Sequence, residues 1–181
     1  MVNGIVDEEL IEKIRTIRLL VLDVDGVMTD GKIIMDDMGR EIKNFDVKDG
    51  HGIKILMRYG IDVVLLTGRQ SVVVEHRAKD LGIGEVHQGI FNKRGIFEEI
   101  LLQRSLSYEN IAFIGDDIVD IPLLKRVGFS VAVADASEDV KKCVDYVTKK
   151  TGGDGAVREV CELILQAQDK WVDVAKRYEF L

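Results

Sequence analysis

Cysteine is scarce in this sequence, and long apolar runs are absent. The two cysteines, Cys143 and Cys161, stand far apart, so neither the close pairs that ligate zinc nor the dense bridges of small secreted proteins are present. The N-terminus carries acidic residues where a signal peptide would need a basic start and an apolar run. No stretch approaches membrane-spanning length. We therefore expect a cytoplasmic protein with no membrane partner.

Positive charge is also in deficit. The chain has 25 lysines and arginines against 32 acidic residues, which gives a formal net charge of −7. Nucleic-acid binding needs a concentrated basic surface that displaces counterions, so we expect no nucleic-acid partner. Of the 181 residues, 46% are hydrophobic, and no linker rich in proline, glycine or serine divides them. This composition predicts one domain over residues 1–181.

Short apolar runs alternate with longer amphipathic stretches along most of the chain. This alternation is typical of βα units, whose parallel strands are buried on both faces. We predict strands at residues 19–24, 63–67, 86–89, 111–115, 130–134 and 146–148. We predict helices at residues 52–59, 71–81, 94–105, 118–127 and 156–168, after an opening amphipathic helix around residues 10–17. The pattern indicates an α/β fold with a doubly wound, Rossmann-like parallel sheet.

Two segments depart from the alternation. In residues 32–45, two short arms flank Asp36, Asp37, Met38 and Gly39, and Gly39 can take the positive φ that a tight turn requires. We predict a β-hairpin flap there. Residues 169–181 follow the last predicted helix as a C-terminal tail, and their pattern predicts no function.

Polar residues follow several of the predicted strands. Asp23 and Asp25 come after the first strand, Thr67 ends the second and Asp116 follows the fourth, while Lys93 opens the helix after the third. In open α/β sheets, ligands bind outside the carboxyl ends of the strands. We therefore expect these five side chains to converge at one edge of the sheet.

The chemistry of these residues predicts a metal-assisted reaction on a phosphate. Asp23, Asp25 and Asp116 would repel one another unless a cation lay among them, and a few carboxylates with waters suit Mg²⁺. Magnesium, the Lys93 ammonium and the Thr67 hydroxyl could then hold a phosphoryl group for transfer. Each motif alone also fits a calcium loop, a surface turn or a helix cap. Their joint occurrence at strand ends favours a catalytic site.

The sequence also resembles a known superfamily. DVDGVMTD at 23–30, LLTGR at 65–69, Lys93 and GDDIVD at 115–120 are similar, in that order, to the four motifs of the haloacid dehalogenase superfamily. DVKDGHGI at 46–53, FNKRG at 91–95, SVAVADA at 130–136 and GGDGAVREVCELIL at 152–165 resemble the family of 3-deoxy-D-manno-octulosonate 8-phosphate phosphatases. The resemblance covers nearly the whole chain. It implies a magnesium-dependent phosphatase of a small sugar acid phosphate, in lipopolysaccharide precursor synthesis.

The resemblance also implies a role for each motif residue. Asp23 becomes phosphorylated as the nucleophile, and Asp25 protonates the departing sugar hydroxyl and then activates water. Thr67 and Lys93 hold the phosphoryl group, and Asp120 orients Lys93. The implied magnesium ligands are Asp23, the backbone carbonyl of Asp25, and Asp116. The implied sugar-binding residues are Asp46, Val47, Lys48, Asp49, Gly50, Lys54, Arg69, Arg77 and Lys93.

No cap domain is expected. Many members of the superfamily carry a cap inserted after the first motif or between the second and third, but here those gaps hold only the hairpin, two helices and a short strand. The resemblance therefore implies a homotetramer in which subunits close each other's sites. The apolar hairpin would pack between subunits, and the glycines at 152–155 would reach a neighbour's cleft.

Three alternatives remain open at this point. The substrate could be another sugar acid phosphate, such as a nonulosonate 9-phosphate. The chain could also be a receiver-like signalling domain, which uses an acidic cluster, a phosphorylated aspartate, a threonine and a lysine on a doubly wound sheet. A noncatalytic binding subunit is the third. The order of the motifs disfavours the receiver, and the filled catalytic positions disfavour the noncatalytic subunit.

Overall fold

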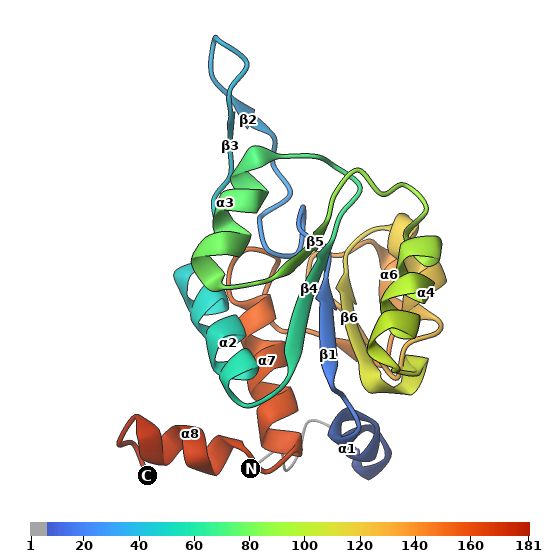
Figure 1. Cartoon of the computed structure of the whole chain (residues 1–181), viewed down its shortest axis with the longest axis vertical. Coiled ribbons are helices and arrows are strands. Elements are labelled where there is room, and N and C mark those ends of the chain that lie inside the picture. The colour runs from blue at the N-terminus through green and yellow to red at the C-terminus, as the bar shows by residue number, and fades with distance from the viewer. Residues whose placement is uncertain (1–6) are drawn as a thin grey trace.

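A six-stranded parallel sheet forms the centre of the molecule (Figure 1). The computed structural model describes residues 7–181, so residues 1–6 of the expected single domain lie outside the described part. The strands run in the order β5-β4-β1-β6-β7-β8, and every neighbouring pair is parallel. They are β1 (Leu19–Leu22), β4 (Asp62–Leu66), β5 (Glu85–His87), β6 (Ile111–Gly115), β7 (Phe129–Ala132) and β8 (Tyr146–Val147). All six predicted strands are confirmed.

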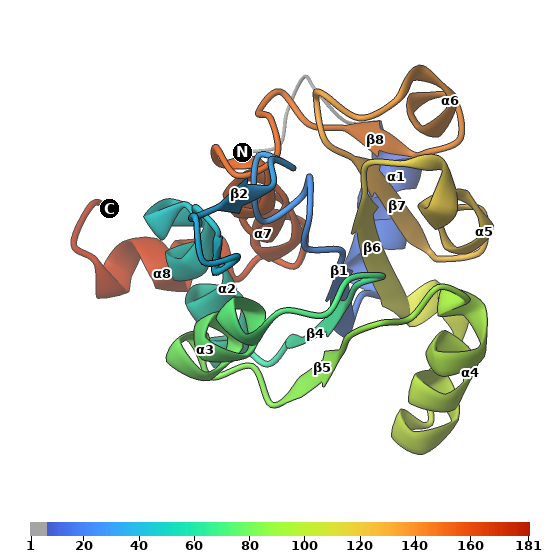
Figure 2. The same ribbon diagram turned by 90° about the horizontal axis from the view of Figure 1, so that it is seen from above.

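Helices cover both faces of this sheet, as the doubly wound arrangement requires (Figure 2). One face carries α2 (Val47–Arg58), α3 (Val72–Leu81) and α7 (Ala156–Ala167). The other carries α4 (Lys93–Arg104), α5 (Ile121–Leu124) and α6 (Glu138–Lys141). The remaining helices are α1 (Glu8–Arg15), α8 (Trp171–Arg177) and the 3₁₀ turns η1 (Tyr108–Asn110) and η2 (Ile118–Asp120). One cluster of buried apolar side chains extends from Ile14 in α1 to Val174 in α8.

Two predicted helices differ from the observed ones. α2 begins at Val47 rather than residue 52, because the Asp46 side chain accepts hydrogen bonds from the first backbone N–H groups and caps the helix. The single helix predicted at 118–127 is instead the 3₁₀ turn η2 followed by the short α5. The tail at 169–181 contains a separate helix, α8, whose Val174 and Ala175 are buried.

The predicted hairpin is present and projects from the carboxyl edge of the sheet (Figure 1). Its strands β2 (Ile34–Met35) and β3 (Glu41–Ile42) pair through two residues each, and Gly39 in the turn has a φ of 75°. The β1–β4 connection contains only this hairpin and α2, and the β4–β5 connection contains only α3. No cap domain is therefore inserted at either place. None of the helices in residues 7–181 combines the length and the hydropathy that a membrane crossing requires.

The packing of α2 on α7 includes a capping contact between residues far apart in the chain. The N-cap position of α7 is Gly155, which has no side chain to accept hydrogen bonds from the first turn. Asp49 of α2 supplies the acceptor, since its carboxylate accepts from the backbone N–H of Arg158 (2.7 Å) and of Gly155 (3.3 Å). Asp49, predicted to bind the sugar, thus holds the start of a helix.

Replacing Asp49 by alanine is expected to lower the free energy of unfolding by about 1–3 kcal/mol at pH 7.5, because two backbone N–H groups lose their acceptor. Urea denaturation measures this loss. Asp49→Asn, which keeps an acceptor oxygen, is the matched control and should lose less. If Asp49→Ala instead raised the substrate KM without changing stability, the capping interpretation would be wrong and the sugar-binding prediction would be favoured.

Candidate active site

The polar side chains predicted to converge line one cleft at the carboxyl edge of the sheet. β1 lies between β4 and β6, which is the point where the strand order reverses and where doubly wound sheets bind their ligands. Asp23 directly follows β1, and Asp116 directly follows β6. The cleft has a volume of about 380 Å³, and its polar lining consists of Asp23, Asp25, Thr67, Arg69, Lys93, Asp116 and Asp117. The predicted convergence is therefore observed.

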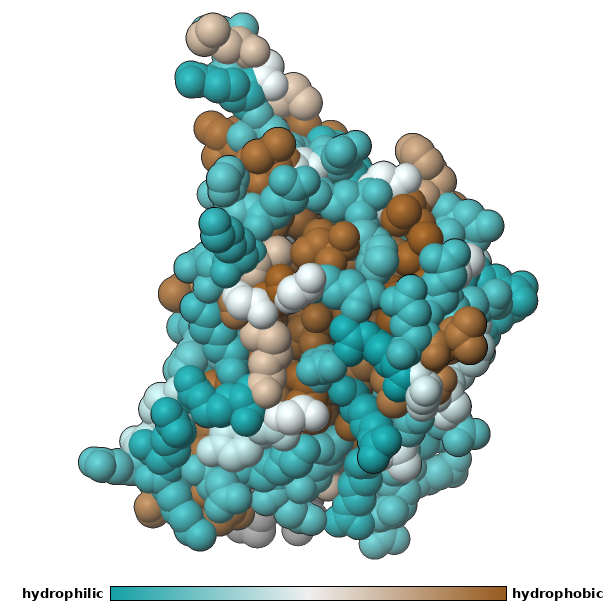
Figure 3. Space-filling view, in the orientation of Figure 1, coloured by the Kyte–Doolittle hydropathy of each residue, from teal (hydrophilic) through white to brown (hydrophobic). Residues whose placement is uncertain are grey.

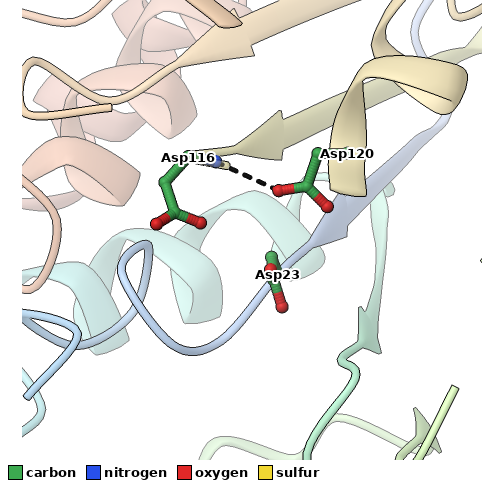
Figure 4. A group of neighbouring side chains, drawn as sticks. All are labelled: Asp23, Asp116 and Asp120. Atoms are coloured by element: carbon green, nitrogen blue, oxygen red, sulfur yellow. Dashed lines mark hydrogen bonds between the residues drawn. The ribbon is translucent and has the colours of Figure 1, made fainter. Parts of the chain in front are cut away.

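Three carboxylates meet at the base of this cleft (Figure 4). One oxygen from each of Asp23, Asp116 and Asp120 lies within 4.8 Å of the others. Asp120 comes from η2, which turns back so that its Oδ2 accepts a hydrogen bond from the backbone N–H of Asp116 at 3.1 Å. The 3₁₀ turn thus fixes the backbone that presents Asp116.

Lys93 is the counter-ion of two of these acids. Its side chain is almost fully buried, and its Nζ lies 2.6 Å from Asp120 Oδ1 and 2.9 Å from Asp23 Oδ2. Nζ also lies 5.8 Å from the centre of the Phe113 ring. Burial lowers the pKa of Lys93, but the charges of Asp23 and Asp120 outweigh it, so the pKa is raised and the ammonium stays charged. If the Lys93 side chain moved away, the buried charges of Asp23 and Asp120 would be left unpaired.

Asp116 carries the unbalanced charge of the cluster. No lysine or arginine in residues 7–181 forms an ion pair with it. Burial, followed by the charges of Asp23, Asp120 and Asp117, raises its pKa to about 7. Burial and then Asp120 also raise the pKa of Asp23, against the opposing effect of Lys93.

This donor set fits a hard divalent cation. Magnesium sites in proteins consist of hard oxygen donors, with one or two carboxylates and waters, and the acids gathered here offer such donors. Both oxygens of Asp120 are engaged, by Lys93 and by the Asp116 backbone, and Asp120 does not line the cleft. Asp23 and Asp116 do line it, so these are the side chains that would bind a metal.

Glycine is required in the loop beside Asp116. Gly26 has a φ of 88°, and a Cβ placed on it would lie 2.1 Å from Asp116 Oδ2. The loop can therefore approach the acids only because residue 26 has no side chain. Gly152 packs on the same loop, where its Cβ would lie 1.8 Å from the Gly26 carbonyl oxygen, and Gly153 donates to the Val27 carbonyl at 2.9 Å. Gly152 and Gly153 are thus packed against their own chain. The expectation that residues 152–155 reach a neighbour's cleft stays a prediction.

Thr67 is held by its backbone at the wall of the cleft. Its N–H donates to the His87 carbonyl at 2.9 Å, and its own carbonyl accepts from Ile90 at 3.1 Å. Thr67 is buried, and its side chain faces the cleft together with Lys93. Both of the predicted phosphate-holding residues therefore lie beside Asp23.

Asp25 is surrounded by cations from two other segments. Lys43 contacts its Oδ1, and the Arg69 Nε lies 3.7 Å from its Oδ2. The sequence analysis did not identify Lys43. Ile42 is exposed while Glu41 and Lys43 face each other across an ion pair, an arrangement that only the structure reveals, so the sequence offered no signal for Lys43.

Most of the predicted sugar-binding residues lie outside this cleft. Arg69 and Lys93 line it, but Asp46, Val47, Lys48, Asp49, Gly50, Lys54 and Arg77 do not. Asp46 caps α2, and its carbonyl accepts from Arg77, which is also paired with Asp80 at 2.9 Å. Gly50 packs against the Arg77 guanidinium. Val47, Lys48 and Lys54 are exposed on α2. Within one chain the structure does not bring these seven residues to the acids.

Comparison with known proteins places this chain among the haloacid dehalogenase-like hydrolases, the superfamily that its motifs resemble. The family model of haloacid dehalogenase-like hydrolases matches residues 84–160. The chain is 47% identical over 173 residues to the 3-deoxy-D-manno-octulosonate 8-phosphate phosphatase of Escherichia coli strain K12, covering 96% of this chain and 92% of that protein.

The chain belongs to the 3-deoxy-D-manno-octulosonate 8-phosphate phosphatase family of haloacid dehalogenase-like hydrolases.

Solved structures of this family have the same fold. The phosphatase from Yersinia pestis superposes with a TM-score of 0.89 at 48% identity, covering 90% of this chain and 88% of that one. The phosphatase from Moraxella catarrhalis, solved in complex with a magnesium ion, a phosphate ion and a 3-deoxy-D-manno-octulosonate molecule, superposes with a TM-score of 0.92 at 39% identity. It covers 94% of this chain and 98% of that one.

Strand order separates this family from receiver domains. Numbered along the chain, the six strands of the main sheet lie in the order 3-2-1-4-5-6. Receivers have the flavodoxin-like order 2-1-3-4-5. The receiver alternative is therefore excluded by topology as well as by family membership.

The raised pKa values predict how stability depends on pH. In the folded protein Asp116 (pKa about 7), Asp49 (about 6) and Asp23 bind protons at a higher pH than in the unfolded chain, where aspartate titrates near 3.9. The folded state therefore binds more protons between these values, and stability falls as pH rises through them. His51, whose pKa is lowered by burial and then by Arg158, acts in the opposite direction.

Thermal melts with a chelator should accordingly show a Tm that increases as pH falls from 8 to 5.5. Saturating Mg²⁺ should raise the Tm at pH 8 and flatten this slope, because a cation among the acids keeps them deprotonated. A metal-free Tm that decreased steadily on acidification across the same window would contradict the assignment.

Proposed function

We propose that this protein hydrolyses 3-deoxy-D-manno-octulosonate 8-phosphate to the free sugar acid and inorganic phosphate. The observation that carries the proposal is the cleft at the switch point, where Asp23, Thr67, Lys93 and Asp116 meet from four separate segments. Family membership supplies the substrate class. The sugar acid that the Moraxella catarrhalis enzyme was solved with is the product of this reaction.

The first step is transfer of the phosphoryl group to Asp23. A carboxylate oxygen of Asp23 forms a bond to phosphorus while the bond from phosphorus to the sugar oxygen breaks. A phosphate charge about 4 Å from the Asp23 carboxylate would be repelled by about 4 kcal/mol at an intermediate dielectric. The Lys93 ammonium, already 2.9 Å from Asp23, offsets this repulsion and binds the phosphoryl oxygens with Thr67.

Magnesium would be held by Asp23, Asp116 and the backbone carbonyl of Asp25. When bound, it supplies further positive charge between the carboxylates and the phosphoryl oxygens. Asp120 serves by fixing Lys93 and the Asp116 backbone.

Asp25 moves the protons of both half-reactions. Its carboxylic acid gives a proton to the sugar oxygen as that oxygen leaves, because an alkoxide is a poor leaving group. Its carboxylate then takes a proton from the water that attacks phospho-Asp23. Inorganic phosphate leaves, and the Asp23 carboxylate is restored.

Arg69 and Lys93 both line the cleft. Because Lys93 binds the phosphoryl group, Arg69 is the partner we propose for the sugar carboxylate. Val47, Lys48 and Lys54 are exposed on α2, and we propose that they contact substrate only if a neighbouring chain brings its α2 to this cleft. Asp46, Asp49, Gly50 and Arg77 then contribute by shaping that end of α2.

A homotetramer would also account for the apolar surface around the cleft. Exposed hairpin residues form a patch that Figure 3 shows on the projecting flap, and Phe91 at the cleft mouth is 91% exposed. The patch consists of Ile33, Met35, Met38 and Ile42. Contiguous exposed apolar residues of this kind are typical of protein interfaces. Sedimentation that found a fully active monomer would contradict the homotetramer.

We also propose that the protein is cytoplasmic and that it consists of a single domain.

The test of the function is phosphate release from a panel of sugar phosphates, with Mg²⁺ and with a chelator. We expect the highest kcat/KM with 3-deoxy-D-manno-octulosonate 8-phosphate, and loss of release with the chelator. A higher kcat/KM for a nonulosonate 9-phosphate would correct the substrate within the enzyme class. No metal-dependent release from any sugar phosphate would contradict the proposal itself.

A further inference from the structure

Lys43 is a buried lysine that none of the four motifs contains. It follows β3 in the hairpin arm, and its side chain is 2% exposed. A buried ammonium is costly unless it is paired. Its partners here are the carboxylates of Asp25 and Glu41, the latter at 3.3 Å. The base of the flap therefore places a fixed positive charge directly on the side chain that the mechanism uses for proton transfer.

The two oxygens of Asp25 have different surroundings. Oδ1 accepts a hydrogen bond from Lys43 Nζ. Among residues 7–181, the cation paired with Oδ2 is Arg69, whose Nε lies at 3.7 Å, beyond hydrogen-bond distance. Because Asp25 also lines the cleft, Oδ2 is the oxygen available to exchange a proton with a substrate.

The position of Lys43 is itself fixed by a second contact network. Glu41 accepts from Arg69 Nη2 at 2.9 Å and from the Ser71 hydroxyl, and it faces Lys43. These contacts join the hairpin arm to the segment between β4 and α3. Lys43 therefore has little freedom to leave Asp25, unlike a lysine on an exposed surface.

We propose that Lys43 is a positioning residue that holds Asp25 Oδ1, so that Oδ2 faces the oxygen of the leaving group. The proposal rests on the proposed function and adds to it a residue outside the four motifs. As the proton passes from Asp25 Oδ2 to the bridging oxygen, the phosphorus–oxygen bond to the sugar breaks and the bond to Asp23 forms. Lys43 also faces the negative charge that remains on Asp25 after the transfer.

The choice of leaving group separates this role from a merely structural one. A sugar alkoxide needs a proton as it leaves, whereas p-nitrophenolate is a stable anion and needs none. The ratio kcat/KM reports the steps through the first irreversible one, in which the leaving group departs. The later hydrolysis of phospho-Asp23 is the same for both substrates and does not enter this ratio.

Lys43→Met keeps the length of the side chain and removes the ammonium. We expect its kcat/KM for 3-deoxy-D-manno-octulosonate 8-phosphate to fall about 30- to 100-fold, which is part of the rate enhancement that general acid catalysis provides. For p-nitrophenyl phosphate the fall should stay below about threefold. Lys43→Arg, which keeps a donor and a charge, should recover most of the activity on the sugar phosphate. Lys43→Gln serves in place of Lys43→Met if the latter does not fold.

Two further variants tie the effect to Asp25. Asp25→Ala should show the same dependence on leaving group, and adding Lys43→Met to it should produce no further loss, because the two residues act as one unit. Lys32→Met is the control, since Lys32 is also on the hairpin but its side chain is 75% exposed and pairs with Asp30. Its kcat/KM should match the wild type with both substrates.

Equal losses on the two substrates would overturn the proposal and assign Lys43 a role in folding or phosphate binding. Unchanged activity on the sugar phosphate, or losses that simply multiply in the double variant, would overturn it as well. Wild-type enzyme that failed to hydrolyse the sugar phosphate would instead count against the proposed function, so the two failures are distinguishable.

Discussion

Asp23→Asn should abolish turnover while leaving the metal-free protein at least as stable as the wild type. An amide cannot form the acyl phosphate through which the reaction passes, so we expect kcat to fall by at least about 10⁴-fold, the scale seen when a nucleophile is removed. Wild-type enzyme quenched during turnover of ³²P-labelled substrate should carry acid-stable label on the protein, and the variant should carry none.

The stability half of this prediction follows from the acidic cluster. Asp23, Asp116 and Asp120 repel one another, and burial with that repulsion raises the pKa values of Asp23 and Asp116. Removing the charge of Asp23 relieves part of the repulsion. Lys93 keeps its contact with Asp120 at 2.6 Å, so no buried ammonium loses its only partner.

Asp117→Asn is the matched control for Asp23→Asn. Asp117 lies beside Asp116 and lines the same cleft, but it is exposed, and its side chain accepts from the Ile118 backbone N–H at 2.7 Å. Asparagine keeps such an acceptor, so activity should stay close to that of the wild type. Substantial turnover by Asp23→Asn, or loss in Asp117→Asn alone, would mean that the nucleophile lies elsewhere.

The sequence predicts the convergence of Asp23, Thr67, Lys93 and Asp116 for a reason that involves no long-range knowledge. Asp23, Thr67 and Asp116 each come at the end of a short apolar run, and Lys93 opens the helix after the third predicted strand. Such runs form parallel strands, and the carboxyl ends of parallel strands share one edge. The period of the pattern thus carries information on where the strand ends lie in space. The strand set and the cleft follow from it, whereas the absence of a cap follows from the short gaps between the motifs of the superfamily.

Asp49 and Lys43 show what such patterns leave out. Asp49 caps α7 across more than a hundred residues of chain, and nothing local to α2 identifies which backbone it will meet. Lys43 reaches Asp25 because the hairpin folds back on its own base. Both contacts depend on how two elements pack on each other, which the spacing of apolar residues in either element does not determine.

The short helix after β6 is a further case of this kind. The apolar spacing of residues 118–127 predicts one helix, but the backbone first makes the 3₁₀ turn η2. That turn directs Asp120 back to Lys93 and to the Asp116 backbone. The regular helix is interrupted here because the site needs the buried carboxylate of Asp120 in one position. The spacing of apolar residues does not predict this interruption.

Lys93→Met should have the second largest effect on activity and should destabilise the fold, in contrast to Asp23→Asn. Without the ammonium, Asp23 and Asp120 remain buried with no cation between them, and the phosphate meets uncompensated charge. We expect kcat/KM to fall about 10³-fold. We expect the free energy of unfolding at pH 8 to fall by about 3 kcal/mol, as when one partner of a buried ion pair is removed.

The pH dependence of Lys93→Met identifies the cause of its instability. The pKa of Asp23, already raised by burial, should rise further once the ammonium is gone, so the variant gains stability on acidification as a proton replaces the ammonium. The deficit against wild type should therefore be larger at pH 8 than at pH 5.5. Adding Asp120→Asn removes one of the two unpaired charges and should restore part of the stability, though not the activity, because no lysine remains to bind the phosphate. Urea denaturation of the wild type and the three variants of this cycle at both pH values measures the coupling. A deficit that is independent of pH and of Asp120 would show that Lys93 stabilises the fold through packing against Phe113 instead.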